Sequence, residues 1–499
     1  MPAPIGYRFG PFEIEAGAYR LMREGAAVPL SPKLVELLLH LVARPGNLVT
    51  KEALFAAVWP DVVVTDNALT QAVSDLRQAL GDNAASPRFI QTVARRGYRF
   101  IAPVTVIEEA QPATTGPMRS ARETSSLDAA QAFTDGKLKL EALDADLVGK
   151  AVADFARAAA LDPRYPAPHV GLANARFYEY ELSRARNRPD HALLAAAIDH
   201  AKRAIELDRD FAEAHATLSF LLVSAGRASE ALSAARHAVR LDPANWAHHF
   251  RHGHAAWGSE RLTALGTALN LYAEFAYGHF ETAMVHIARG DLDRAEHALR
   301  EGVIVQDRQA GRRERFPARG LHWLLGLVRL GRGDAAEAAV EFERETVPNA
   351  QLYAPEFAMN AFDGLGFAAL ALGDAARASE SFRRALELFP GHARSHVGLA
   401  VAFDRGGRGG AAAGELARAR QAAADLTRGG RIAEARLVEA FERVAAAAPE
   451  EACEALERLL GVEGHYFAGW TIPIEPLLAS LRGQSRFDRV LATVAERAG

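Results

Sequence analysis

The stretch from Asp66 to Phe100 reads DNALTQAVSDLRQALGDNAASPRFIQTVARRGYRF, and it predicts an amphipathic helix followed by a hairpin that carries arginines. Helical spacing places a set of apolar side chains on the back of the helix: Leu69, Ala72, Val73, Leu76 and Leu80. The opposite face receives a polar set: Asn67, Gln71, Ser74 and Gln78. Such a helix docks by its apolar back and leaves amide and hydroxyl groups free to bind a ligand.

The hairpin follows at once. Apolar positions alternate with polar ones in residues 89–93 and 98–101, and Arg95, Arg96 and Gly97 between them predict a tight turn. Amide side chains suit the base edges of a major groove, where glutamine can bond adenine through two hydrogen bonds. Arginines on a hairpin can lie along phosphates or enter a minor groove. The combination therefore favours contact with DNA.

Upstream, the sequence predicts short strands and two more helices. Alternating residues in 7–9, 12–14 and 19–21 favour strands that are separated by glycine-containing turns. Ser31 and Pro32 then open a helix that ends near Arg44. A second helix runs roughly from Lys51 to Trp59 and is broken by Pro60. The predicted order is strands, three helices and a hairpin.

This order, with the phrases LSPKLVELLLHLVARPGNLVTKEALFAAVW, TDNALTQAVSDLRQALGD and FIQTVARRGYRFIAPV, resembles the winged-helix DNA-binding domain of OmpR/PhoB-type transcriptional regulators. The resemblance runs from about Tyr7 to Pro103, and it implies an α+β winged helix-turn-helix domain over residues 1–107 that binds double-stranded DNA. It implies these DNA contacts: Asn67, Gln71, Ser74 and Gln78 toward bases, Arg77 on the flank of the helix toward phosphate, and Arg95 and Arg96 on the wing.

The loop from Trp59 to Asp66 corresponds to a segment that can contact RNA polymerase in this family. Its run Val62-Val63-Val64 is unusually apolar for a loop. Two interpretations remain open, because an exposed apolar loop suggests a protein partner, whereas the same residues could pack beneath the domain.

The sequence departs from the family in three respects. Asp75 stands where many relatives place a basic residue, and a carboxylate near phosphate is repelled unless it accepts a bond, for example from a cytosine amino group. No receiver domain is recognisable, so control by aspartyl phosphate is not expected. No apolar stretch approaches the ~18 residues of a membrane span, so we expect a soluble, cytoplasmic protein without membrane contact.

Composition agrees with a large protein rich in helix formers. The chain has 499 residues, of which 49% are hydrophobic and 24% charged, and this length predicts more than one domain. The formal net charge of -4 divides unevenly, with +2 in residues 1–107 and -6 in the remainder. DNA binding would then depend on a few local arginines, with modest, salt-dependent non-specific affinity. The single cysteine, Cys453, excludes an intramolecular disulfide.

The rest of the chain contains a linker and then repeats. Residues 108–127 are rich in Pro, Thr, Ser and Glu and predict a flexible linker that begins near Val104. The phrase RAIELDRDFAEAH at 203–215 recurs as HAVRLDPANWAHH at 237–249, a spacing of 34 residues from Asp208 to Asp242. The internal spacing also recurs, because Gly226 precedes Asp242 by 16 residues and Gly373 precedes Phe389 by 16.

These periods resemble tetratricopeptide (TPR) repeats from about Leu127 to Leu426. We expect roughly six to eight repeats, in which the C-terminal helices count as divergent ones. The implied fold class is mostly α, with the winged helix followed by an all-α TPR solenoid over residues 128–499. The segment from Trp470 to Val490 is expected to form a terminal cap. Stacked helix pairs curve into a solenoid, whose concave groove would take a protein or peptide partner.

The sequence gives little support for a catalytic site or a metal site. His248, His249, His252 and His254 are clustered, but a histidine recurs at one repeat position: His169, His215, His249, His279 and His396. We therefore interpret these histidines as part of the repeat and expect no metal. No GxxxxGK[ST] phosphate loop occurs, the glycine run in 405–410 fits an inter-helix turn, and no nucleophile has a recognisable base. We expect no cofactor, no catalytic residue and no enzyme.

The sequence thus predicts a sequence-specific DNA-binding transcriptional regulator, with the solenoid as a protein-interaction or effector-sensing module in signal transduction. The alternative is a protein-binding scaffold whose winged helix contacts protein rather than DNA, and Asp75 together with the near-neutral domain charge favours it. An enzyme would need a catalytic site in residues 305–350, where none is visible. A small-molecule sensor in the groove remains open.

Overall fold

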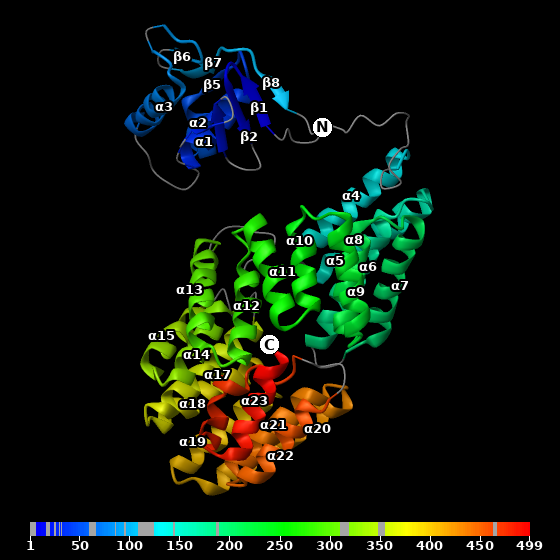
Figure 1. Cartoon of the computed structure of the whole chain (residues 1–499), viewed down its shortest axis with the longest axis vertical. Coiled ribbons are helices and arrows are strands. Elements are labelled where there is room, and N and C mark those ends of the chain that lie inside the picture. Colours follow the sequence, from blue (N-terminus) through cyan, green and yellow to red (C-terminus); the bar gives the residue numbers. More distant parts are fainter. Residues whose placement is uncertain are drawn as a thin grey trace. The chain divides into compact units, whose positions relative to one another are not determined.

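In the computed structural model the chain divides into two compact units, Met1–Met118 and Arg119–Gly499 (Figure 1). The structure describes residues 6–15, 20–23, 26–28, 30, 32–58, 66–84, 86–93, 96–107, 124–142, 145–185, 189–309, 319–347, 355–462 and 467–499. Some expected features lie outside these residues: most of the linker at 108–123, most of the apolar loop at 59–65, and Arg95.

The first unit combines strands and helices in two sheets. Its described elements are β1 (Gly6–Phe9), β2 (Phe12–Glu15), β3 (Arg20–Arg23), β4 (Ala26–Val28), α1 (Pro32–Val42), β5 (Leu48–Thr50), α2 (Lys51–Val58), α3 (Asp66–Leu80), β6 (Ile90–Val93), β7 (Gly97–Phe100) and β8 (Thr105–Ile107). One sheet has the strand order β4-β3-β2-β1-β8 and the other β5-β7-β6, and neighbouring strands are antiparallel throughout. This confirms an α+β domain.

Three strands differ from the sequence expectation. β4 and β5 have only three residues each, too few to show a period in the sequence. β8 falls where we expected the linker to begin, near Val104, and that expectation was wrong for residues 105–107. The strand exists because these residues pair with β1, from Gly6 opposite Ile107 to Arg8 opposite Thr105. Tertiary pairing decides such short strands.

An aromatic cluster joins the two sheets. The ring centroid of Phe9 lies 5.0 Å from that of Phe100, and the centroid of Phe12 lies 5.6 Å from that of Phe89. All four rings are buried. Edge-to-face aromatic pairs add stabilisation to the area that they bury. The base of the β6–β7 hairpin is therefore fixed by the core.

Glycine is required at the start of β7. Gly97 has φ +152°, and a Cβ added there would lie 2.1 Å from the carbonyl oxygen of Val49 and 2.9 Å from the Cα of Thr50. Such a contact is impossible without moving β5, so Gly97 lets the hairpin approach that strand closely.

The second unit is a stack of helix pairs, each an A helix followed by a B helix. The described pairs are α4 (Leu127–Glu141) with α5 (Ala145–Leu161), α6 (Ala167–Ala185) with α7 (His191–Leu207), α8 (Ala212–Ser224) with α9 (Ala228–Leu241), α10 (Trp246–Ala255) with α11 (Gly258–Leu271), α12 (Ala276–Ala288) with α13 (Leu292–Gln309), α14 (Leu321–Arg332) with α15 (Ala335–Glu345), α17 (Pro355–Ala371) with α18 (Ala375–Leu388), α19 (Ala393–Arg405) with α20 (Gly409–Arg428), and α21 (Ile432–Ala445) with α22 (Pro449–Leu460). The described residues hold nine pairs, one more than the upper expectation, because divergent sequences still form the same hairpin.

A recurring contact packs these pairs. The B-helix ring of Phe382 faces glycines on the A helices before and after it: an added Cβ would lie 2.5 Å from the ring at Gly366 and 2.4 Å at Gly398. The same arrangement recurs around Phe155 and Phe342, again with glycines on both neighbouring A helices. A large ring opposite two small residues fills the space between three helices. This contact sets the spacing of successive pairs.

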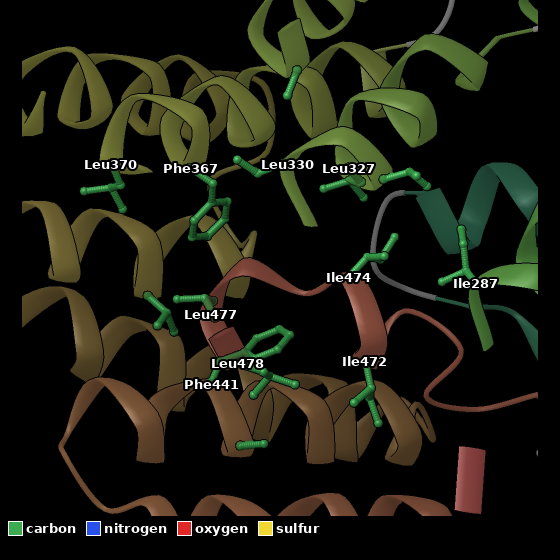
Figure 2. Close-up of a cluster of buried hydrophobic side chains, with 14 of the residues drawn as sticks. Ile287, Leu327, Leu330, Phe367, Leu370, Phe441, Ile472, Ile474, Leu477 and Leu478 are labelled. Atoms are coloured by element: carbon green, nitrogen blue, oxygen red, sulfur yellow. The ribbon is translucent and has the colours of Figure 1, made fainter. Parts of the chain in front are cut away.

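The sequence predicts that the C-terminal segment caps the last helix pair. In the structure this segment also contacts helices of earlier pairs. After α22 come two short 3-10 helices, η1 (Ile472–Ile474) and η2 (Pro476–Leu481), and then α23 (Ser485–Arg497). η1 contacts α12 and α14, and η2 contacts α14 and α21. Figure 2 shows Leu477 between Phe441 on one side and Phe367 and Leu370 on the other. The segment therefore crosses the A helices of several earlier repeats.

Candidate nucleic-acid interface

Helix α3 has the two faces that its sequence predicts. Leu69, Val73 and Leu76 on the back have no exposed surface and pack into the core of the first unit. The front presents Gln71, Ser74 and Gln78, which are all exposed. Residues spaced by three and four positions lie on one side of a helix, so these three form one polar stripe. We call Gln71, Ser74 and Gln78 the polar stripe of α3.

Asn67 and Arg96 are two further residues that the sequence predicts to contact DNA. Asn67 lies in the first turn of α3, and its backbone is helical there. Arg96 lies at the turn between β6 and β7 and is exposed, and its amide donates to the carbonyl oxygen of Val93 at 3.0 Å. The structure therefore places an exposed arginine at the turn of the hairpin.

Arg77, which the sequence predicts to contact phosphate, makes two hydrogen bonds within the domain. Its Nη2 atom donates to the carbonyl oxygen of Ile90 at 2.7 Å and to Oγ1 of Thr92 at 2.8 Å. Both acceptors belong to β6. A hydrogen bond that involves a charged group contributes about 1.5–3 kcal/mol. Arg77 therefore ties α3 to the hairpin, which fixes the position of the hairpin beside the polar stripe.

Within the polar stripe, Gln71 makes a hydrogen bond along the helix. Its Nε2 atom donates to Oδ1 of Asp75 at 2.7 Å. This bond gives the Asp75 carboxylate a partner on its own helix, and it leaves the carbonyl oxygen of Gln71 as an acceptor. The Asp75 carboxylate thus accepts a hydrogen bond from Gln71, and it would repel a nearby phosphate.

Asp82 is a positioning residue that the sequence argument missed. Its Oδ1 accepts from the amide of Arg88 at 2.6 Å, and its Oδ2 accepts from the amides of Phe89 at 3.3 Å and Ile90 at 2.8 Å. Just before it, Gly81 ends α3 with φ +62°. The sequence signal was the Leu-Gly-Asp phrase at the close of the helix, because glycine ends helices and aspartate accepts bonds from loop amides.

The histidines at the repeat position have a structural role. In three copies a ring nitrogen lies within hydrogen-bond distance of the carbonyl oxygen six residues earlier: His215 to Arg209 at 2.8 Å, His249 to Pro243 at 2.8 Å, and His396 to Pro390 at 2.9 Å. Each bond closes the turn between a B helix and the next A helix. The recurrence of histidine follows from that turn.

The buried His322 of the solenoid is paired with two carboxylates. The ring of His322 lies between Glu341, at 2.6 Å from Nδ1, and Asp307, at 2.9 Å from Nε2. Burial acts to lower the pKa of His322, but the two carboxylates outweigh it and raise that pKa.

Among the residues that the structure describes, no group of three or more His, Cys, Asp or Glu side chains could hold a metal ion. In the same residues, no helix has both the length and the apolar character of a membrane span.

Comparisons with known proteins match two separate parts of the chain. The family model described as "Transcriptional regulatory protein, C terminal" matches residues 25–100, and a tetratricopeptide repeat model matches residues 361–392.

Similar curated proteins are regulators. The transcriptional activator CadC of Escherichia coli (strain K12) is 32% identical over 137 residues, which cover 24% of this chain and 27% of CadC. The cholera toxin transcriptional activator of Vibrio cholerae is 41% identical over 71 residues, which cover 14% of this chain and 24% of that protein. The aligned part is thus about a quarter of the length of these relatives. The matching curated proteins point to regulators of transcription, not to enzymes.

A solved structure matches the same region. The DNA-binding domain of Klebsiella pneumoniae RstA, in complex with the RstA box, is 31% identical and covers 19% of this chain and 96% of that chain, with a TM-score of 0.18.

Proposed function

We propose that this chain, which carries an OmpR/PhoB-type winged-helix domain followed by tetratricopeptide repeats, is a sequence-specific transcriptional regulator that binds double-stranded DNA in the cytoplasm. In this proposal residues 1–107 bind DNA, 108–127 connect the domains, and 128–499 bind a protein partner. The observation that carries it is the polar stripe of α3, which the buried leucines and valine behind it hold outward. A polar helix face of this kind fits a major groove.

We assign the DNA contacts as follows. Asn67, Gln71, Ser74 and Gln78 read base edges, and Arg95 and Arg96 contact the backbone or the minor groove beside them. Because Nε2 of Gln71 is bonded to Asp75, the pair offers mainly acceptor oxygens, which suits an amino group of adenine or cytosine. The loop at 59–66 is assigned to RNA polymerase, in line with its apolar valines.

Binding of the full chain to a library of genomic fragments tests the proposal. Arg96→Ala is expected to weaken binding to all sequences and to reduce the salt slope by about 1, because one phosphate contact is lost. Gln71→Ala should instead change the base preference at one position of the site. Selection of bound fragments, followed by titration at several salt concentrations, measures both effects.

Matched controls exist in the solenoid. Gln421 makes the same helical bond to an aspartate, with its Nε2 at 3.1 Å from Asp425, so Gln421→Ala removes an equivalent side chain away from the stripe. Arg300→Ala likewise removes one exposed arginine. Both controls should bind as the parent does. Equal binding by Gln71→Ala, Arg96→Ala and the parent would refute the assigned contacts.

Two observations support the scaffold alternative. The Asp75 carboxylate lies on the front half of α3, and the first 107 residues carry a net charge of only +2. A winged helix that contacts protein would bind genomic fragments without sequence preference. The fragment selection above therefore separates the two functions.

A further inference from the structure

The inner face of the later repeats is already occupied by the chain itself. Ile472, Ile474 and Leu478 each keep only 1% of their surface exposed. Ile474 reaches so close to α14 that a Cβ on Gly331 would lie 3.2 Å from its Cα. In Figure 2 Ile474 lies near Leu327, and Leu478 lies beside Phe441. We call residues 471–481 the groove segment.

A buried carboxylate anchors the groove segment. Glu475 is 5% exposed, and its Oε1 accepts from Nε of Arg394 at 3.1 Å and from Nη2 at 3.0 Å. Arg394 on α19 also bonds Asp363 on α17, and its guanidinium lies 4.5 Å from the ring centroid of Phe367. Two nitrogens on one oxygen make a charge-assisted contact. Arg394 is thus built into the A helices and presents one side to the segment.

The groove segment differs from the repeats that it contacts. It contains two prolines, Pro473 and Pro476, and its helical turns are all of the 3-10 type. η1 and η2 contact α12, α14 and α21, which precede them in the chain, and η1 also contacts α23. A short, proline-stiffened stretch that is bound through side chains to a concave helical surface has the form of a bound peptide.

We propose that the inner face of α12 to α21 is a peptide-binding groove, and that the groove segment is its exchangeable intramolecular ligand. The chemistry that it selects is a pair of aliphatic side chains around a proline, a glutamate for Arg394, and then a proline with a leucine pair. The proposal deepens the protein-binding role proposed above for the solenoid, and it rests on that role but not on DNA reading.

The covalent connection between the groove segment and the repeats explains why this segment occupies the inner face. A linked ligand experiences an effective concentration in the millimolar range, so an external segment must compete with that value. Cutting the connection removes this advantage and keeps the contacts of the groove segment. Exchange should then depend on the contacts of the groove segment and of α23.

The experiment uses the folded chain with a specific protease site in place of residues 463–466, cut after purification. A fluorescently labelled fragment 467–499 is then added, and fluorescence anisotropy follows its entry. We expect saturable exchange into the cut protein, while the far-ultraviolet circular dichroism stays unchanged. A synthetic peptide of residues 470–482 should compete for the same site.

The labelled fragment is compared with two variants. Glu475→Gln removes the charge that faces Arg394 and should weaken binding about tenfold. Glu496→Gln, at an exposed position on α23, changes the same side chain away from the groove and should bind within about twofold of the parent.

Two results would overturn the proposal. One is exchange that begins only at denaturant concentrations that also reduce the helical signal, since the segment would then be part of the core. The other is equal binding of the parent and Glu475→Gln fragments. Neither measurement involves DNA, so a failure here leaves the proposed regulator untouched, and loss of DNA binding would leave this result standing.

Discussion

At the scale of single residues, Arg77 holds together helix α3 and the hairpin, the two parts of the proposed DNA-binding surface. Its guanidinium is partly buried and bonded to the backbone of Ile90 and the hydroxyl of Thr92. Helical position alone would place it on the flank of α3, facing outward. The packing of β6 against that flank turns the side chain into a link within the domain.

Replacing Arg77 by Met tests this role. We expect the opening free energy of the β6 and β7 amides to fall by about 1–3 kcal/mol, because the bonds to Ile90 and Thr92 are lost. The salt slope of DNA binding should not change. Hydrogen exchange and a salt titration give the two values.

The control is Arg88→Met, which removes an exposed arginine near the same hairpin. If Arg77 contacted phosphate instead, its loss would lower the salt slope by about 1 and leave amide exchange as in the parent. That pattern would contradict the linking role.

At the scale of elements, the solenoid is organised by large rings opposite glycines. Phe382 on α18 has no exposed surface and touches positions 366 and 398 on the two flanking A helices. Helix propensity disfavours glycine in both places by about 1 kcal/mol. The packing gain of a whole phenyl ring outweighs that cost.

Gly398→Ala is therefore expected to destabilise the solenoid by about 1–3 kcal/mol, since the new methyl would overlap the ring of Phe382. Thermal denaturation followed by circular dichroism should show a lower melting temperature. Gly414→Ala on α20 is the matched control, because that glycine is exposed and has no neighbour within 4 Å. It should stabilise by up to about 1 kcal/mol. Equal shifts for both variants would mean that the ring does not set the spacing.

At the scale of the whole molecule, histidines couple stability to pH. Burial is the main cause of a lowered pKa at His169 and at His392, and each pKa falls to about 4. Four others are also lowered, again mainly by burial: His200, His215, His279 and His286. His322 shifts in the opposite direction.

A histidine with a lowered folded pKa contributes stability that is present above the unfolded value of about 6.5 and is lost as pH falls toward the folded value. We therefore expect the free energy of unfolding to decrease between pH 6.5 and pH 5, by about 1–2 kcal/mol for His392 alone. Urea denaturation at each pH measures it. His322 acts above this window, because a raised pKa gives stability that is lost as pH rises.

Substitution identifies the group. His392→Gln should flatten the pH dependence between 6.5 and 5, whereas His297→Gln, at an exposed position, should leave the curve parallel to that of the parent. A curve for His392→Gln as steep as the parent curve would mean that this histidine is not responsible.

The sequence alone predicted the elements whose pattern is local and long. The back of α3, the hairpin and the 34-residue repeat all appear in the sequence, because a helix or a helix pair repeats its apolar spacing over many residues. The polar stripe followed from the same periodicity, since side chains opposite a buried face must point outward.

Only the tertiary structure decided what depends on residues far apart in the chain. Strand β8 forms by pairing with β1, and the side chain of Arg77 is directed by its bond to β6. The groove segment packs against α12 and α14, which lie more than a hundred residues before it. The sequence predicted only a terminal cap from Trp470 to Val490. The apolar side chains of the groove segment are buried because the helix stack curves and brings its inner surface to them. A local sequence pattern does not predict that curvature.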